Sequence, residues 1–325
     1  MISALALSPS LDVTYVVDEL EGIQRPLSTH RVPGGKALNA ARAAAALGAR
    51  VSAVAVLGAG VGDDVAAGAR AEGVDLHVVP GEEATRSCVS ILSRRSGRLT
   101  EVYEQAVPLA AATAAAAVDT AVALAARRPG WWFASGGLPA SAPAGLLAEV
   151  VRSWHDAGVR VAVDSHGPAL RSAVLARPDL VKVNRAEAVE LTGADQQAPV
   201  SEILAEVRAL TGGAVVVTDG AAGAWATDGR RVLRARLEGH VGRFPVGSGD
   251  SFLSGLLVAL DRGDDLAGAM ALATAAGTAN AQVPGAAVLD PVLVGRLVAE
   301  VELTEAAYPG GARPDRRSGA QSATT

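Results

Sequence analysis

Short apolar segments alternate with helix-like segments along most of the chain, and this alternation restricts the fold more than any other feature of the sequence. The apolar segments include "WWFASG" (131–136), "RVAVDS" (160–165), "DLVKVN" (179–184) and "AVVVTDG" (214–220). Amphipathic patterns such as "PVSEILAEVRALTG" (199–212) lie between them. Continuous apolar strands separated by helices are typical of a parallel sheet that is buried on both faces. The sequence therefore predicts an α/β fold with a mostly parallel sheet and helices on both faces.

Two stretches interrupt the alternation and predict a second, smaller sheet. The stretch "TRSCVSILSRRSGRLTEVYE" (85–104) has apolar residues on both sides of a polar turn, as a β-hairpin does. The stretch "VTYVV" (13–17) is an isolated strand pattern, and the polar segment 20–32 follows it. We expect these parts, about 12–32 and 85–104, to form a small β-sheet beside the main domain.

Composition limits the partners of the chain. Half of the 325 residues are hydrophobic, so a large core is possible, but aromatic residues make up only 3% of the chain. The core must therefore consist mainly of Ala, Val and Leu. The formal net charge of −5 does not favour nucleic-acid binding, which usually depends on a basic surface. The main domain is expected to span residues 1–305, and the Pro-, Gly-, Ser- and Arg-rich tail 306–325 is expected to be disordered.

The sequence also favours a cytoplasmic location and no membrane partner. The Ala-rich stretch 109–130 contains Asp119 and several Thr residues, which favours a helix packed inside a soluble protein. The N-terminal stretch lacks the charged and long apolar segments of a signal peptide. Cys88 is the only cysteine, so an intrachain disulfide is excluded, as fits a reducing compartment.

The stretch "VGSGDSF" (246–252) predicts either an anion site or an ordinary helix start. Gly247 and Gly249 allow backbone conformations that a Cβ disfavours, and with Ser248 they can present N–H groups at a helix N-terminus. Asp250 could then accept a proton from a hydroxyl beside the bound anion. The alternative is that Asp250 simply caps the helix.

The stretch "PGGKALNAARAAAALG" (33–48) is a glycine turn that leads into an Ala-rich helix. Gly34 and Gly35 permit the backbone to approach a ligand closely, and Lys36 and Asn39 share one face of the first helical turn. These side chains could bind a polyol or a phosphate. The alternative is a plain turn with a surface lysine.

The stretch "LVKVNRAEAVEL" (180–191) places Asn184 and Glu187 three residues apart where a strand meets a helix. An amide and a carboxylate there could organise hydrated Mg²⁺, which prefers oxygen ligands. Lys182 lies on the same strand face as Asn184. The alternative is a capping box without a ligand.

The stretch "VTDGAAGAW" (217–225) ends a buried strand in a loop of small residues. Thr218, Gly220 and Gly223 could line a nucleotide site there, and the alternative is an ordinary hairpin turn.

Taken together, and in their order along the chain, these motifs resemble those of the PfkB (ribokinase-like) carbohydrate kinase family. The resemblance covers roughly residues 1–300. The stretch "LSPSLDVTY" (7–15) is similar to the family's N-terminal substrate strand. Within the family, "SGGLP" (135–139) and "VDSHGPAL" (163–170) are most similar to the 1-phosphofructokinase and tagatose-6-phosphate kinase branch. The resemblance implies a Rossmann-like α/β domain with a small β-sheet lid.

The resemblance also implies roles for individual residues. Asp250 would be the catalytic base, and Gly247, Ser248 and Gly249 the anion hole. The residues implied to hold the sugar are Asp12, Gly34, Gly35, Lys36, Asn39, Arg86 and Ser135, with Arg86 on a substrate phosphate. The residues implied to bind ATP are Lys182, Asn184, Thr218, Gly220, Gly223 and Asn280. Asn184 and Glu187 would hold Mg²⁺ through water. The family also implies a lid that makes a dimer contact, and it allows a monovalent cation such as K⁺.

Four positions depart from the family pattern. Ala37 replaces a usual Gly, Ser8 a common Asn, and Val183 a usual Pro. Gly137 stands where members that use phosphosugars commonly have a second Ser, which is expected to bond the substrate phosphate.

The sequence therefore predicts a Mg·ATP-dependent kinase that phosphorylates a hydroxymethyl group of a hexose phosphate. Fructose 1-phosphate is the first choice of acceptor, followed by tagatose 6-phosphate and fructose 6-phosphate. A kinase of an unphosphorylated sugar or a nucleoside is the alternative, and Gly137 is its best support. A non-catalytic nucleotide- or sugar-binding regulator is a third hypothesis, against which the intact "GSGD" stretch (247–250) argues.

Overall fold

A computed structural model describes residues 1–139, 141–143 and 145–308, and within them the predicted alternation builds one large sheet. In spatial order its strands are β14 (Glu302–Ala307), β13 (Arg231–Arg236), β12 (Ala224–Thr227), β11 (Ala214–Thr218), β10 (Leu180–Asn184), β9 (Arg160–Asp164), β8 (Trp131–Ser135), β1 (Ile2–Ala6), β4 (Val51–Leu57) and β5 (Val74–Pro80). Neighbours are parallel from β11 to β5 and antiparallel from β11 to β14. The prediction of a mostly parallel sheet is therefore confirmed.

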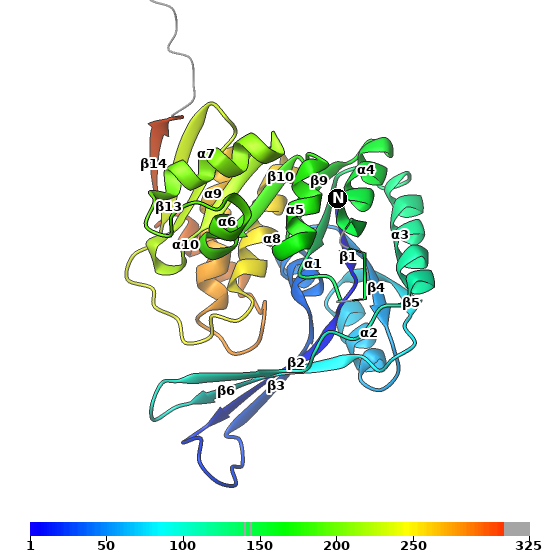
Figure 1. The fold of residues 1–325 in the computed structure, drawn as a ribbon. Coiled ribbons are helices and arrows are strands. Elements are labelled where there is room, and N and C mark those ends of the chain that lie inside the picture. The colour runs from blue at the N-terminus through cyan, green and yellow to red at the C-terminus, as the bar shows by residue number, and fades with distance from the viewer. Residues whose placement is uncertain (140, 144, 309–325) are drawn as a thin grey trace, which may run out of the picture.

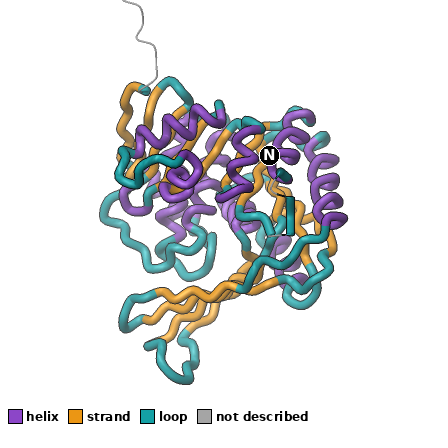
Figure 2. Tube along the Cα trace, in the orientation of Figure 1, coloured by secondary structure: helices purple, strands orange, loops and turns teal. Residues whose placement is uncertain are grey.

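Helices cover both faces of this sheet, as predicted (Figures 1 and 2). On one face lie α1 (Lys36–Ala46), α2 (Gly62–Ala71), α8 (Ser248–Arg262) and α9 (Leu266–Asn280). On the other face lie α3 (Ala111–Ala125), α4 (Leu146–Asp156), α5 (Gly167–Leu175), α6 (Arg185–Thr192) and α7 (Val200–Thr211). The helix α10 (Pro291–Val298) packs against α9.

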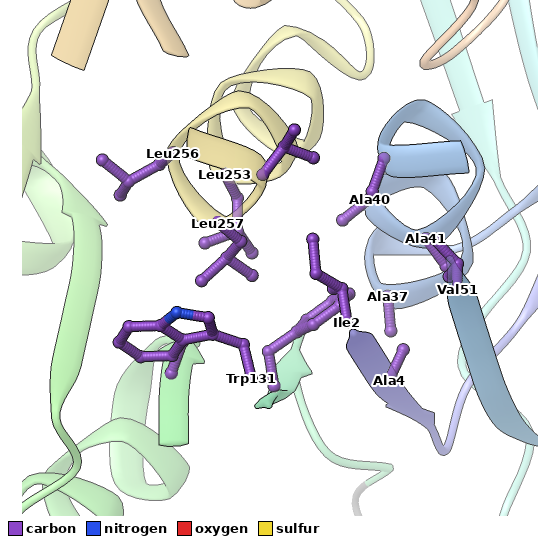
Figure 3. Close-up of a cluster of buried hydrophobic side chains, with 14 of the residues drawn as sticks. Ile2, Ala4, Ala37, Ala40, Ala41, Val51, Trp131, Leu253, Leu256 and Leu257 are labelled. Atoms are coloured by element: carbon purple, nitrogen blue, oxygen red, sulfur yellow. The ribbon is translucent and has the colours of Figure 1, made fainter. Parts of the chain in front are cut away.

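The core is built mainly from small and branched aliphatic side chains, as the low aromatic content requires. Strand β1 contributes to both faces, because Ile2 and Ala4 point to the α1 side while Leu5 points to the α3 side. Figure 3 shows the cluster of buried side chains on the α1 side, where α1, α8, β1, β4 and β8 meet. Among its members are Ala37, Ala40, Ile2, Val51, Trp131 and Leu253. On the other face, Trp132 and Trp154 are buried with ring centroids 5.3 Å apart.

The second sheet also forms, in the order β3 (Ser28–Gly34), β2 (Ser10–Val17), β6 (Arg86–Ser93) and β7 (Leu99–Tyr103). It projects from the main body, and Figure 1 shows it below the end of β1. The hairpin predicted in residues 85–104 is the antiparallel pair β6 and β7. The isolated strand predicted at 13–17 is the second half of β2, which lies between β3 and β6.

The C-terminal part differs from the sequence prediction. Strand β14 continues to Ala307, where it pairs with Arg231, so the first two residues of the predicted tail belong to the main sheet. The rest of that tail, from residue 309, lies outside the described residues. None of the helices in the described part of the chain is long and apolar enough to cross a membrane.

The order of the strands determines where a ligand can bind. The chain passes from β1 to β4 on one side, and later to β8 on the other side of β1. At such a reversal the connections leave in opposite directions and open a crevice at the carboxyl ends of the strands. The small sheet follows directly from β1, so it lies at this same edge.

Candidate active site

A cavity of about 520 Å³ lies at the carboxyl ends of the parallel strands, between the main sheet and the small sheet. Most of the residues predicted for the site line this cavity, namely Asp12, Gly35, Lys36, Asn39, Arg86, Ser135, Lys182, Asn184, Glu187, Thr218, Gly247, Gly249 and Asp250. They come from segments far apart in the chain. The predicted residues that do not line it are Gly34, Gly220, Gly223, Ser248 and Asn280.

The first turn of α8 forms one wall of the cavity. Gly247 caps the helix with a φ of 82°, in the left-handed region, and a Cβ there would lie 2.3 Å from the backbone nitrogen of Ala287. Only glycine fits this position without strain. The helix has no side-chain cap, and Asp250 lies inside it as its third residue. The alternative of a capping aspartate is therefore wrong.

One of the backbone donors predicted at this helix start, the N–H of Ser248, is already paired. The Ser248 N–H donates to the carbonyl of Pro245 (3.1 Å), and the Ser248 Oγ accepts from Asn280. No hydrogen bond between described residues uses the N–H of Gly249 or Asp250. The N–H of Gly247 is likewise unused among the described residues. Helix N-termini attract anions through such unpaired donors, so the N–H groups of Gly247, Gly249 and Asp250 are available to an anion.

Asp250 is a buried carboxylate, 6% exposed, that faces the cavity. Asn39 Nδ2 donates to its Oδ2 (3.0 Å) and lies 3.4 Å from Oδ2 of Asp12. Burial, together with the negative charge of Asp164, raises the pKa of Asp250 to about 7, although Lys36 and Lys182 oppose the shift. A carboxylate with this pKa can take up a proton near neutral pH.

Asp12, on β2, is a second acid that lines the cavity. Ser10 Oγ donates to its Oδ1 (2.6 Å), and burial raises the pKa of Asp12. A Cβ on Gly34 would lie 2.1 Å from the Asp12 carboxyl carbon, so this glycine leaves the space that the carboxylate occupies. Gly34 thus supports the site from behind the cavity wall.

A cluster of charges continues along the wall from Asp250. Lys182 Nζ donates to Oδ2 of the fully buried Asp164 (2.7 Å), and Lys36 Nζ lies 3.7 Å from its Oδ1. Burial alone would raise the pKa of Asp164, but Lys182 and Lys36 outweigh it and hold the pKa below its usual value. In return Asp164 raises the pKa of Lys36. Asp164 and Lys36 therefore stay charged at neutral pH.

The sequence signal for Asp164 was its position as the polar end of a buried strand. That position placed it at the ligand edge of the sheet without indicating a role.

Asn184 and Glu187 form a capping box at the start of α6. Asn184 Oδ1 accepts from the Glu187 N–H (2.9 Å), and Glu187 Oε2 accepts from the Asn184 N–H (2.8 Å). The pair therefore forms the capping box that the sequence allowed. Both residues still line the cavity, and the other carboxylate oxygen of Glu187 lies 3.6 Å from Lys36 Nζ.

The oxygen groups here fit a hydrated Mg²⁺ better than a cage made by protein alone. Asp164 Oδ1 is buried and accepts no hydrogen bond, although Lys36 lies nearby. The described residues contain no group of three or more His, Cys, Asp or Glu side chains with the spacing of a metal site. Mg²⁺ characteristically keeps several waters and takes one or two carboxylates together with substrate phosphates.

The glycines predicted to line a nucleotide loop have a structural role here. β11 and β12 are antiparallel and pair Thr218 with Ala224, so the loop is a hairpin connection. A Cβ on Gly223 would lie 2.4 Å from the carbonyl oxygen of Ala235, and Gly220 begins a short 3-10 turn. Of the three predicted residues, Thr218 alone reaches the cavity.

Asn280 supports the loop before α8. It is fully buried, and its Nδ2 lies within hydrogen-bonding distance of the carbonyls of Val246 (2.8 Å) and Phe244 (3.2 Å) and of Ser248 Oγ (3.1 Å). It therefore holds the loop that carries Gly247, and it does not line the cavity. The sequence could not separate these two roles, because both place an amide near the same loop.

Basic and polar groups complete the wall on the side of the small sheet. Arg86 donates to the carbonyls of Glu104 (3.1 Å) and Ser8 (3.3 Å), and its guanidinium faces the cavity. Ser135 Oγ is buried without a hydrogen-bond partner. His166 also lines the cavity, and the sequence analysis did not assign it a role.

A buried base beside backbone donors at a helix start, with charged side chains along the wall, suits the transfer of a phosphoryl group to a hydroxyl. That reaction depends on positioning and on stabilising charge. The fold and the site thus define the class of phosphotransferases.

Comparison with known proteins narrows this class. The chain belongs to the pfkB family of carbohydrate kinases, whose sequence profile matches residues 8–292. The 1-phosphofructokinase of Rhodobacter capsulatus is 33% identical, over 84% of this chain and 88% of that protein. The chain is therefore a PfkB-type sugar kinase, as its sequence predicted.

Solved structures share the fold. Phosphofructokinase-2 of Escherichia coli, 24% identical, matches 92% of this chain and 98% of its own with TM-scores of 0.83 to 0.84. Its structures include complexes with potassium and with fructose-6-phosphate, and a tetrameric inhibited form.

Proposed function

We propose that this protein transfers the γ-phosphate of Mg·ATP to a hydroxymethyl group of a hexose phosphate, with fructose 1-phosphate as the acceptor. Tagatose 6-phosphate and fructose 6-phosphate are the next acceptors. The observation that carries the proposal is Asp250, a buried carboxylate with a pKa of about 7 beside three backbone N–H groups that no described residue accepts. The 1-phosphofructokinase relative supports the choice of acceptor.

In this proposal Asp250 removes the proton from the acceptor hydroxyl, and the N–H groups of Gly247, Gly249 and Asp250 stabilise the transferred phosphoryl group. The hydrogen bond from Asn39 orients the carboxylate, and Asn39 also lies beside Asp12, which binds sugar hydroxyls. Burial excludes water from the carboxylate and strengthens these interactions. The base therefore acts only on a hydroxyl that the sugar site has positioned.

In this proposal the polyphosphate of ATP lies beside Lys182, Asn184 and Glu187, and Lys36 belongs to the sugar site. Lys36 bridges Asp164 and Glu187, so it joins the acceptor wall to the nucleotide wall. Mg²⁺, when bound, neutralises phosphate charge and fixes the geometry of the β- and γ-phosphates. Asn184 and Glu187 would hold Mg²⁺ through water. The proposal also keeps K⁺ as an activating cation, which the potassium complex of the E. coli relative supports.

The small sheet is the proposed dimer contact. Several apolar side chains on it or in its β2–β3 loop are exposed, namely Leu20, Ile23, Leu27, Val102 and Tyr103. Association would bury these side chains, and the tetrameric form of the E. coli relative supports an oligomer. Light scattering of the purified protein tests this, and a monomer at all concentrations would contradict it.

The function is tested by an ATP-consumption screen across sugar phosphates, free sugars and nucleosides. We expect turnover with fructose 1-phosphate at the highest kcat/KM and a requirement for Mg²⁺. Preferred turnover of a free sugar or a nucleoside would show that the acceptor is wrong while the kinase chemistry is right. ATP binding without turnover of any acceptor would favour the regulator hypothesis.

A further inference from the structure

The loops that follow β8 and β9 are tied together at the cavity. The Gly136 N–H donates to the carbonyl of Asp164 (2.8 Å), and Ser165 Oγ donates to the carbonyl of Gly136 (2.9 Å). These bonds fix the next residue of each loop, Gly137 and His166, opposite one another. Both residues line the cavity.

Gly137 leaves the space that the His166 ring fills. A Cβ on Gly137 would lie 2.7 Å from Cε1 and 2.8 Å from Nε2 of His166, closer than such atoms can approach. Gly137 is not one of the glycines with a positive φ, so its backbone does not require glycine. The missing side chain at 137 is therefore explained by the presence of the imidazole.

The imidazole is available to a ligand. His166 is exposed at the start of α5 and makes no side-chain capping bond to it, and no hydrogen bond joins its ring to another described residue. Of the basic side chains on the cavity wall, Lys36 and Lys182 pair with carboxylates. In the described part of the chain, Arg86 and His166 have no carboxylate within 4.0 Å. The wall thus keeps two basic groups for an anion.

We propose that His166 determines acceptor specificity by donating a hydrogen bond from its ring to the phosphate of the sugar phosphate, in the space that Gly137 leaves open. Arg86 adds positive charge to the same wall. This inference rests on the proposed function, because it names the group that recognises the phosphorylated acceptor. Gly137 then no longer favours an unphosphorylated sugar as the acceptor, because the His166 ring takes over the hydrogen bond that a serine at position 137 would make.

The test is calorimetric binding of fructose 1-phosphate and of fructose, without ATP, to the wild type and to His166→Ala, Gly137→Ala and the double variant. Removing a hydrogen bond to a charged group lowers the binding affinity about tenfold or more. We expect His166→Ala to raise the Kd of fructose 1-phosphate by about that factor and to change fructose binding much less. His166→Asn, which keeps a donor, is expected to recover part of the affinity.

Gly137→Ala tests the shared space. We expect it to weaken fructose 1-phosphate binding, because the new methyl group displaces the ring, and to have no further effect in the His166→Ala background. His155→Ala is the matched control, since that histidine lies on α4, is paired with Asp179 and does not line the cavity.

Several outcomes would overturn the inference. They are unchanged binding in His166→Ala, an equal loss for fructose, an additive effect of Gly137→Ala in the double variant, or no binding of fructose 1-phosphate to the wild type. Binding that depends on His166 in a protein that never consumes ATP would support the inference and refute the proposed function. Turnover of fructose 1-phosphate that is unchanged in His166→Ala would support the proposed function and refute the inference.

Discussion

Replacing Asp250 by Asn removes its charge and keeps its shape, and the pKa of about 7 makes the consequence measurable. An aspartate in an unfolded chain has a pKa near 3.8, so between pH 3.8 and about pH 7 the folded protein keeps a proton that the unfolded chain has released. The folded state then binds more protons, and stability falls as pH rises through this window. Above about pH 7 the contribution of Asp250 no longer changes. The asparagine that replaces it in the variant does not titrate.

The magnitude follows from the same values. Each pKa unit corresponds to about 1.36 kcal/mol, and the window from pH 5 to pH 7 spans two of them. The free energy of unfolding of Asp250→Asn, relative to the wild type, should therefore rise by about 3 kcal/mol between pH 5 and pH 8. The loss of the base should lower kcat by about 10²- to 10⁴-fold, while binding of Mg·ATP stays within a few-fold of the wild type.

Urea unfolding of both proteins at pH 5, 6, 7 and 8 measures this difference. Groups that titrate equally in both proteins cancel. Asp156→Asn, on the exposed end of α4, is the control for losing one negative charge. A stability difference that stays constant from pH 5 to pH 8 would refute the reasoning about burial, and near-normal turnover in Asp250→Asn would refute its role as the base.

Three further predictions follow from the site. The kcat/KM should rise with pH to a plateau with a midpoint near 7, because the base must be ionised; a flat profile down to pH 5.5 would exclude Asp250 as the group that titrates. Lys182→Met should lower the free energy of unfolding by about 3–5 kcal/mol, because it leaves the buried Asp164 without its 2.7 Å partner, and adding Asp164→Asn should recover part of the loss; equal denaturation midpoints would argue against this. Arg86→Ala should raise the KM for fructose 1-phosphate about tenfold or more and change that of fructose much less; steady-state kinetics with both sugars decides, and an unchanged ratio would remove Arg86 from the phosphate site.

Local patterns in the sequence were enough to predict the sheet, its helices and the small second sheet. Strand β11 is apolar up to its last residue, Thr218, because helices cover both of its faces, and this burial shows in a few consecutive residues. The hairpin of β6 and β7 was predicted from a different signal, apolar residues on both sides of a polar turn. Strand β14 was missed, because "ELTEAA" is short and polar and lies at the sheet edge.

The sequence also indicated most of the residues that meet at the cavity, because chemistry at the carboxyl ends of parallel strands uses short local motifs. Asp250, Lys36 and Asn39 belong to such motifs, and they line one cavity. The local motifs predicted the roles of Ser248 and Gly223 less well. Their roles depend on a hydrogen bond to Pro245 and on the approach of another strand, which neighbouring residues do not reveal.

The sequence by itself thus determined the class of fold and the set of groups available for catalysis, since both depend on residues close together in the chain. The tertiary structure decided which charges meet and how they behave. Lys36 lies far from Asp164 in the chain, and Lys182 lies on the neighbouring strand. Together they keep the buried carboxylate of Asp164 charged, and both lower the pKa of Asp250 against the effect of burial. Packing likewise brought His166 to the space beside Gly137. Solvation and electrostatic interactions depend on distances in space, and only the packed chain defines those distances.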